Sequence, residues 1–287
     1  SGGSNAYTSG AITNYFFQIT HEGFGLALDR FSDFFKAPLF DKTYSEREVK
    51  AVNNEHQKNK LNDGWRGSFV SKQVSEPGHP LTKFGTGNQD TLSGDNRPAL
   101  LDFYKEYYSA SNMKLALISN MPMQNLFGIA KKYFSGIPTR EVNIPSMPKI
   151  FRKPFKNHFR LLRVKTIKDI RSLEIDFPTI RLKDYQDSKP AGIIGSLIGH
   201  EGKGSLLSKL KEEGLVLSLS AGGGSSHPDI NSFGISVSLT PKGLQNYERI
   251  LHLIFNYIRM IREHGVEEYT FKESQTMAQI NFDWKNP

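Results

Sequence analysis

The sequence contains no cysteine. This absence excludes a disulfide framework, a thiolate zinc site and a cysteine nucleophile, so any metal must be held by histidine and carboxylate side chains. No run of about 18 apolar residues occurs either, so we expect no membrane-spanning helix. The first residues, "SGGSNAYTSG", lack a basic region and an apolar stretch. They are therefore not expected to form a signal peptide, and they do not resemble a natural N-terminus.

The composition is that of an ordinary globular protein, with 287 residues of which 37% are hydrophobic and 23% charged. This length exceeds one typical domain, so we expect two. The net charge of +8 and the basic residues 152–171 raise the question of nucleic-acid binding. The other basic residues are scattered, and this stretch falls at the expected domain junction, so we expect no nucleic-acid partner. Compartment is not fixed, although the cytosol is slightly favoured.

Hydrophobic periodicity predicts a mixture of strands and helices. Alternating apolar residues predict a strand at residues 14–20, and helical spacing predicts a helix from Phe24 that ends before Pro38. A further helix is predicted to open at Ser45, where Ser45 and Glu48 form a capping box, and to continue to about Asn62. The other predicted strands lie at residues 114–119, 172–177, 215–220 and 233–240, and the other predicted helices at residues 126–134, 191–198 and 205–214 and in a long segment through Arg262.

The sequence repeats itself at a shift of 220 residues. Both copies share, in order, a glycine turn, a strand, a threonine, a glycine and a helix, and a one-residue shift then aligns Trp65 with Trp284. The aligned pairs include Tyr15 with Ile235, Phe17 with Val237, Ile19 with Leu239, Thr20 with Thr240 and Gly23 with Gly243. We therefore expect an α+β protein of two related, duplicated domains, each a mostly antiparallel sheet packed with helices, at residues 1–150 and 151–287.

The repeat also predicts what each copy lacks. In the second copy the glycine turn follows residues 189–220, which are predicted to hold two helices and a strand. Ser1 begins after the corresponding point of the first copy, so the first domain is expected to be incomplete at its N-terminus. By the same comparison, the second domain is expected to be incomplete at its C-terminus.

Glu55 differs from its counterpart in the repeat, which is Gln275, or Ser274 after the one-residue shift. The carboxylate is therefore not required by the scaffold. Glu48 and Glu55 lie two helical turns apart on one face, about 10 Å along the axis, with Val52 between them. We expect this face to pack inward, where two carboxylates need a cation. The alternative is a solvent-facing helix in which Glu48 only caps and Glu55 pairs with Lys58.

Five long stretches resemble the insulinase and pitrilysin family of zinc peptidases, and the resemblance covers nearly the whole chain. They are "GGSNAYTSGAITNYFF", "APLFDKTYSEREVKAVNNEHQKN", "HPLTKFGTGNQDTL", "IKDIRSLEIDFP" and "LIGHEGKGSLLSKLKEEG". In this family zinc is bound by an inverted H-x-x-E-H motif, whose glutamate is the general base, and by a glutamate about 77 residues further on. The distal glutamate opens an E-H-x-K-N sequence, so the resemblance implies that Glu55 is the third zinc ligand. It also implies that Glu48 is an outer carboxylate that orients a metal-bound histidine.

The sequence departs from the family pattern in one respect: it has no H-x-x-E-H motif, since "HEGFG" at residue 21 and "HEGKG" at residue 200 do not match it. The resemblance places the motif about 22 to 26 residues ahead of Ser1. No catalytic residue is therefore expected in this chain, which should neither bind zinc nor cut peptides alone. The counterpart positions in the second copy are Ile194, Leu197 and Ile198, which cannot bind zinc, so the second domain is expected to hold no metal.

The family resemblance also implies two substrate-binding surfaces. "SNAYTS" resembles an edge strand that hydrogen-bonds to an extended peptide, and "GHEGKG" with "SLSAGGG" resembles a surface that holds the N-terminal segment of the substrate. An ordinary edge strand and ordinary glycine turns are the alternatives. His200 is expected to be a turn or substrate residue, because no second ligand follows four residues later. The predicted substrate-binding residues are Asn5, Ala6, Tyr7, Thr8, Trp65, His200, Gly202, Gly204 and Gly222.

The sequence thus predicts part of a zinc metalloendopeptidase that degrades peptides in an enclosed chamber. The expected partners are peptide substrates and a homologous C-terminal half in the same or another chain, with a homodimer as a further assembly. The alternative is a catalytically silent family member that acts as a scaffold or assembly subunit. Glu48 and Glu55 argue against this alternative because a scaffold needs neither acid, and the residues ahead of Ser1 would decide between the two.

Overall fold

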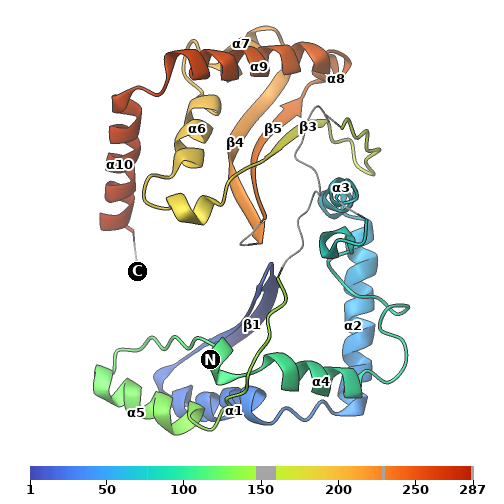
Figure 1. The fold of residues 1–287 in the computed structure, drawn as a ribbon, viewed down its shortest axis with the longest axis vertical. Coiled ribbons are helices and arrows are strands. Elements are labelled where there is room, and N and C mark those ends of the chain that lie inside the picture. The colour runs from blue at the N-terminus through green and yellow to red at the C-terminus, as the bar shows by residue number, and fades with distance from the viewer. Residues whose placement is uncertain (76, 147–159, 228–229, 286–287) are drawn as a thin grey trace. The chain divides into compact units, whose positions relative to one another are not determined.

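Figure 1 shows the computed structural model of the chain, which describes residues 1–75, 77–146, 160–227 and 230–285. The chain divides into two compact units. The first comprises residues 1–7 and 14–168, and the second comprises residues 8–13 and 169–287. The predicted boundary between residues 150 and 151 lies outside the described residues, as do residues 152–159 of the basic stretch. Within the described residues, no helix is both long and apolar enough to cross a membrane.

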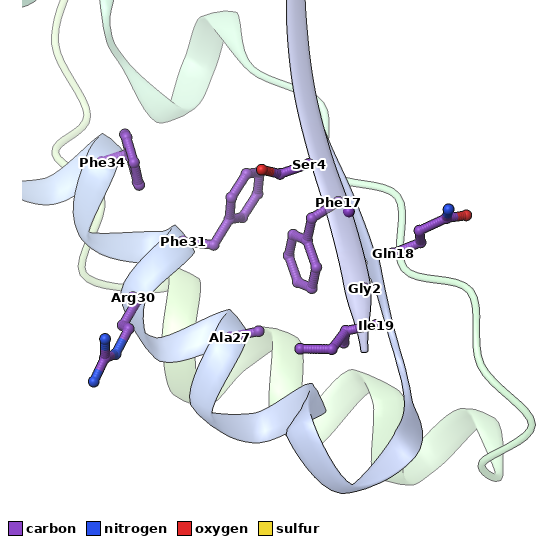
Figure 2. Close-up of a pocket in the computed structure, with 10 residues that line it drawn as sticks. Gly2, Ser4, Phe17, Gln18, Ile19, Ala27, Arg30, Phe31 and Phe34 are labelled. Atoms are coloured by element: carbon purple, nitrogen blue, oxygen red, sulfur yellow. The ribbon is translucent and has the colours of Figure 1, made fainter.

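Among its described residues, the first unit combines five α-helices with most of a β-hairpin, whose turn at residues 8–13 belongs to the second unit. Aromatic side chains join the hairpin to the first helix. The ring centroids of Phe17 and Phe31 lie 5.0 Å apart (Figure 2), and those of Tyr15 and Phe35 lie 5.6 Å apart, both edge to face. Leu28, on the same helix, is fully buried. The elements are β1 (Gly2–Ser9), β2 (Ile12–Ile19), α1 (Phe24–Lys36), α2 (Lys42–Lys60), α3 (Asp63–Lys72), α4 (Arg97–Tyr107) and α5 (Met123–Phe134).

The predicted start of α2 is wrong. The helix begins at Lys42, where the carboxylate of Asp41 accepts hydrogen bonds from the backbone N–H groups of Thr43 at 2.9 Å and Tyr44 at 3.2 Å. Ser45 already donates its N–H to the carbonyl of Asp41. The Ser45 and Glu48 capping box is therefore not formed, because Asp41 satisfies the free N–H groups one turn earlier.

The predicted strand at residues 114–119 is also wrong. The described part of this unit has a sheet of only two strands, β1 and β2, so these residues have no strand to pair with. The side chain of Ile118 is 93% exposed. An apolar run with β propensity becomes a strand only where a neighbour accepts its backbone hydrogen bonds, which the sequence pattern alone does not reveal.

The segment that leads into the second unit is held by α3. The carboxylate of Asp63 accepts hydrogen bonds from the backbone N–H groups of Ile167 at 2.8 Å and Lys168 at 2.9 Å. These two bonds hold the pKa of Asp63 below its usual value. Arg160 also donates to the carbonyl of Val74 at 3.0 Å. The described end of the basic stretch is thus fixed by its own hydrogen bonds.

The second unit packs helices on a three-stranded antiparallel sheet with the order β3-β5-β4. Ile235 on the central strand pairs with Ile175 on one side and with Ala221 on the other. Helix α6 packs on β4, and α7 packs on both β4 and α9 (Figure 1). The elements are β3 (Ser172–Pro178), α6 (Pro190–Ile198), α7 (Leu206–Glu212), β4 (Val216–His227), β5 (Ile230–Leu239), α8 (Pro241–Gln245), α9 (Tyr247–His264) and α10 (Glu268–Asp283).

The core of this unit lies between the sheet and the helices α6, α7 and α9. Its buried members are Ile198, Leu206, Leu207, Leu210, Leu215, Val216, Leu219, Ile235, Val237, Leu239, Ile250 and Ile254. The long predicted helix is two helices, because the chain breaks at Asn246 between α8 and α9. The predicted α+β class, with antiparallel sheets packed by helices, is confirmed.

Candidate functional site

Helix α2 presents Glu48 and Glu55 to solvent. Both side chains are exposed, and neither has an ion-pair or hydrogen-bond partner among the described residues. The prediction that this face packs inward is therefore wrong for the two carboxylates, although Val52 between them is partly buried. The alternative pair of Glu55 with Lys58 is not formed either. Two carboxylates on one helix face are thus left available to bind a cation from outside the described residues.

A neighbouring face of α2 is anchored by the loop at residues 84–92. His56 is only 8% exposed, and its ring nitrogens lie 3.2 Å from the hydroxyl of Thr86 and 3.4 Å from the amide nitrogen of Asn88. The side chain of Asn53, one turn earlier, accepts the backbone N–H of Gln89 at 3.2 Å. Because an amide nitrogen can only donate, Nε2 of His56 accepts from Asn88, and Nδ1 donates to Thr86. These bonds fix the rotation of α2 about its axis and so the direction of Glu55.

Trp65 lies beside this anchor. It is 40% exposed and stacks on Phe84, with ring centroids 5.7 Å apart and planes 28° apart. The Phe84 ring also contacts the rings of His56 and Phe69, with centroid distances of 4.9 Å and 5.3 Å. A Cβ on Gly85 would lie 2.8 Å from the Trp65 ring, so the loop can approach only because this residue is glycine. Phe84 thus joins α2, α3 and the loop, a role that no periodicity in the sequence reveals.

Strand β1 carries the first group of predicted substrate-binding residues. Asn5, Ala6, Tyr7 and Thr8 are all exposed, and β1 pairs only with β2 in the described part of the chain. The side chain of Asn5 accepts the backbone N–H of Ala6 at 2.8 Å. Tyr7 packs edge-on against Phe16 at 6.5 Å. The outer edge of β1 is therefore open to an extended peptide, provided that the Asn5 amide moves off Ala6.

The second group surrounds the turn between α6 and α7. Nδ1 of His200 accepts the N–H of Gly202 at 3.1 Å, and a Cβ on Gly202 would lie 2.5 Å from the His200 ring. Gly204 has a positive φ of 83°. Turn geometry thus accounts for Gly202 and Gly204 without any ligand. Gly222 has no such requirement, because a Cβ there would meet nothing within 4 Å, and it lies on β4, an edge strand of the sheet.

A metal ion does not fit the described residues by themselves. They contain no group of three histidine, aspartate or glutamate side chains that could hold one. Glu55 supplies an oxygen ligand of the type that zinc accepts, but it lacks the two histidines that would complete such a site.

Comparison with known proteins finds relatives that match nearly the whole chain. Residues 1–78 match the family described as "Insulinase (Peptidase family M16)", and residues 96–277 match "Peptidase M16 inactive domain". Insulin-degrading enzyme of Homo sapiens is 40% identical over 294 residues, covering 99% of this chain and 29% of that enzyme. The Schizosaccharomyces pombe protein named "Putative zinc protease mug138" is 37% identical over 288 residues, covering 97% of this chain and 29% of that protein.

The solved structures include the same fold. The crystal structure of pitrilysin superposes with a TM-score of 0.86 at 30% identity, covering 100% of this chain and 31% of pitrilysin. The chain thus spans less than a third of the length of the curated relatives described above.

Proposed function

The chain belongs to the M16 insulinase family of peptidases, and from this premise we propose that it forms part of a zinc-dependent metalloendopeptidase. The proposed enzyme degrades peptides held in an enclosed chamber, and this chain contributes one zinc ligand and two peptide-binding strands. A homologous C-terminal half, in the same or another chain, is the proposed partner, and a homodimer is a further proposed assembly.

The observation that carries this proposal is the environment of Glu55. Its carboxylate is exposed and without a partner among the described residues, while His56 beside it is buried and hydrogen-bonded by the loop. Such an arrangement stabilises the direction of a side chain that contributes nothing to the fold. Glu55 is the proposed third zinc ligand, and Glu48 on the same face is the proposed partner of a metal-bound histidine. Zinc in such a site polarises a peptide carbonyl and lowers the pKa of its bound water.

We further propose that the chain holds two duplicated domains, with residues 1–150 on the zinc side and residues 151–287 without metal. The shift of 220 residues supports this division, because it carries β2 (Ile12–Ile19) onto residues 232–239, inside β5 (Ile230–Leu239). It likewise carries residues 2–7 of β1 onto residues 222–227 of β4. Most of α1 falls on α9.

The two edge strands are the proposed peptide contacts. Asn5, Ala6, Tyr7 and Thr8 on β1, together with Trp65 on α3, are proposed to bind the segment around the scissile bond. His200, Gly202, Gly204 and Gly222 are proposed to bind the N-terminal segment of the substrate. Open backbone at β1 and β4 supports this assignment, because an extended peptide gains affinity from main-chain hydrogen bonds and specificity from pockets for alternate side chains.

A peptidase assay tests the proposed function. A quenched fluorogenic peptide is offered to this chain, to a form extended upstream by about 50 residues to include the expected motif, and to the full-length gene product, each with and without 1,10-phenanthroline. We expect cutting by the full-length protein, its loss with the chelator, and none by this chain. If the full-length protein does not cut and binds no zinc, the scaffold alternative replaces the peptidase. If this chain alone cuts, the proposed metal site is wrong.

A further inference from the structure

One aromatic ring, that of Phe84, lies against residues of both α2 and α3. It meets the His56 ring on α2 edge to face, with centroids 4.9 Å apart and planes at 73°. It stacks on Trp65 of α3, with centroids 5.7 Å apart and planes at 28°. His56 is the neighbour of the proposed zinc ligand Glu55, and Trp65 is a proposed peptide contact. Phe84 therefore touches a residue beside each part of the proposed site.

Hydrogen bonds from both helices hold the backbone on either side of Phe84. Ahead of it, the side-chain amide of Gln73, the C-cap residue of α3, donates to the carbonyl of Thr82 at 2.7 Å. After it, the hydroxyl of Thr86 lies 3.2 Å from Nδ1 of His56 on α2. A shift of Phe84 toward or away from either helix therefore disturbs one of these bonds.

Helices α2 and α3 bury few side chains of their own. Every residue of the two helices is described, and among them only His56 is buried. The helices are joined by Leu61 and Asn62 alone, and Leu61 is 69% exposed. This short connection fixes where the helices meet. The side chains that pack between them, Phe84 above all, fix how each helix is turned.

We infer that Phe84 is a positioning residue that couples the zinc ligand to the choice of peptide. Its ring holds His56, and through α2 the direction of Glu55, while its face sets the plane of the Trp65 indole against which a peptide side chain packs. This inference rests on the proposed roles of Glu55 and Trp65. A change in the ring of Phe84 is therefore expected to alter zinc affinity and peptide preference together.

The ring of Phe84 matters here, and not only the volume that it fills. Edge-to-face and stacked pairs are oriented because the face of an aromatic ring is negative and its edge is positive. Phe84→Leu keeps an apolar side chain in the same place but presents no ring face to Trp65 or His56. Phe84→Tyr keeps the ring. These two substitutions therefore separate the orientation of the neighbours from simple packing.

Fluorescence tests the contact with Trp65 in this chain. The sequence has two tryptophans, and Trp284, which is 83% exposed, is replaced by phenylalanine so that Trp65 alone reports. We expect acrylamide quenching of Trp65 to rise about twofold in Phe84→Leu, because stacking covers one of the two indole faces. Quenching should stay unchanged in Phe84→Tyr. Unchanged quenching in a folded Phe84→Leu protein would overturn the inference.

Circular dichroism identifies a variant that does not fold. If Phe84→Leu unfolds, Phe84→Met takes its place, because methionine adapts its shape to irregular gaps and also lacks a ring. The same rise in quenching is then expected, and its absence again overturns the inference.

The full-length gene product tests the coupling between metal and peptide. Zinc affinity, measured by competitive titration, should fall by about tenfold or more in Phe84→Leu, as for other residues that support a zinc ligand. Two peptides that differ only by phenylalanine or alanine beside the scissile bond give a ratio of kcat/KM values. This ratio should fall at least about threefold, because the indole plane is no longer fixed. A loss of stability alone would lower the active fraction and leave the ratio unchanged.

Phe69→Leu is the matched control. Phe69 lies on α3 with its ring centroid 5.3 Å from that of Phe84, but in the described part of the chain it makes no ring contact with His56 or Trp65. Zinc affinity and the peptide ratio should therefore stay close to those of the parent protein. Equal effects of Phe69→Leu and Phe84→Leu would overturn the inference.

Failure of the proposed function has a different signature. The unsubstituted full-length protein would then bind no zinc and cut no peptide. The quenching of Trp65 in this chain needs neither metal nor peptide, so it decides independently whether Phe84 positions Trp65.

Discussion

Replacing Glu55 by glutamine is expected to lower the zinc affinity of the full-length protein by more than about 100-fold, since changes to outer partners of zinc ligands alone cost about 10 to 100-fold. Glutamine keeps the size of the side chain and removes its negative charge, which the ion requires. Folding should be unaffected, because Glu55 is exposed and has no partner among the described residues. The measurement is competitive zinc titration with a chromophoric chelator, together with thermal unfolding.

Helix α2 supplies matched controls for this experiment. Glu46 is also exposed, and at 100° per residue it lies on the opposite side of the helix from Glu48 and Glu55. Glu46→Gln should therefore leave zinc affinity unchanged. Glu48→Gln should lower it by about 10 to 100-fold, as expected of a carboxylate that orients a ligand. If all three variants bind zinc as tightly as the unsubstituted protein, neither Glu55 nor Glu48 contributes to the metal site.

Replacing Gly243 by alanine is expected to destabilise the second unit by at least about 3 kcal/mol, at the upper end for an overpacked site. A Cβ on Gly243 would lie 1.9 Å from the carbonyl oxygen of Leu215. That oxygen accepts hydrogen bonds from the backbone N–H of Thr240 at 3.0 Å and from its hydroxyl at 3.2 Å. The contact is with backbone, so relief requires that α8 moves away from the start of β4 and that these bonds weaken.

Two other glycines make the comparison specific. Gly192 lies in α6, where a Cβ would meet only the Lys189 Cβ at 3.9 Å, so Gly192→Ala should change stability by less than about 1 kcal/mol. Gly23 is the counterpart of Gly243 in the proposed duplication, but its Cβ would meet only the end of the Ile19 side chain, at 2.7 Å, which can rotate. Gly23→Ala should therefore cost less than Gly243→Ala.

Hydrogen exchange is the appropriate readout for these variants, because two units need not unfold together. The amides of Val237 and Leu239 lie in the central strand and report on the second unit. Their protection should fall in Gly243→Ala and persist in Gly192→Ala. Unchanged protection in Gly243→Ala would mean that the close approach of Gly243 to Leu215 is not essential to the fold.

The fold was predictable where periodicity and local turn chemistry agree. Strands β2, β3 and β5 and helices α1, α5, α6 and α7 all lie close to their predicted positions, because each has an apolar face that packs on its own unit. The start of α2 was not predictable, because Asp41 and Ser45 are both good N-cap residues and only the structure shows which one is used. Helices α3, α4 and α10 were not predicted.

The candidate site shows a similar division. The sequence motif singles out Glu55, and the structure adds that His56, Asn53 and the loop at residues 84–92 hold its helix. Those contacts join residues about 30 positions apart, so no local pattern could reveal them. The expectation that Glu48 and Glu55 face inward was wrong because periodicity identifies residues that share a face, and not what that face meets.

The most direct measurement is the anomalous diffraction signal of zinc in crystals of the full-length protein, collected on both sides of the zinc absorption edge. Our account predicts one zinc peak with an oxygen of Glu55 at about 2.0 to 2.2 Å, the usual distance for a carboxylate ligand. Two histidines from outside this chain should complete the protein ligands. A zinc peak held by other side chains, with Glu55 still facing solvent, would contradict the account.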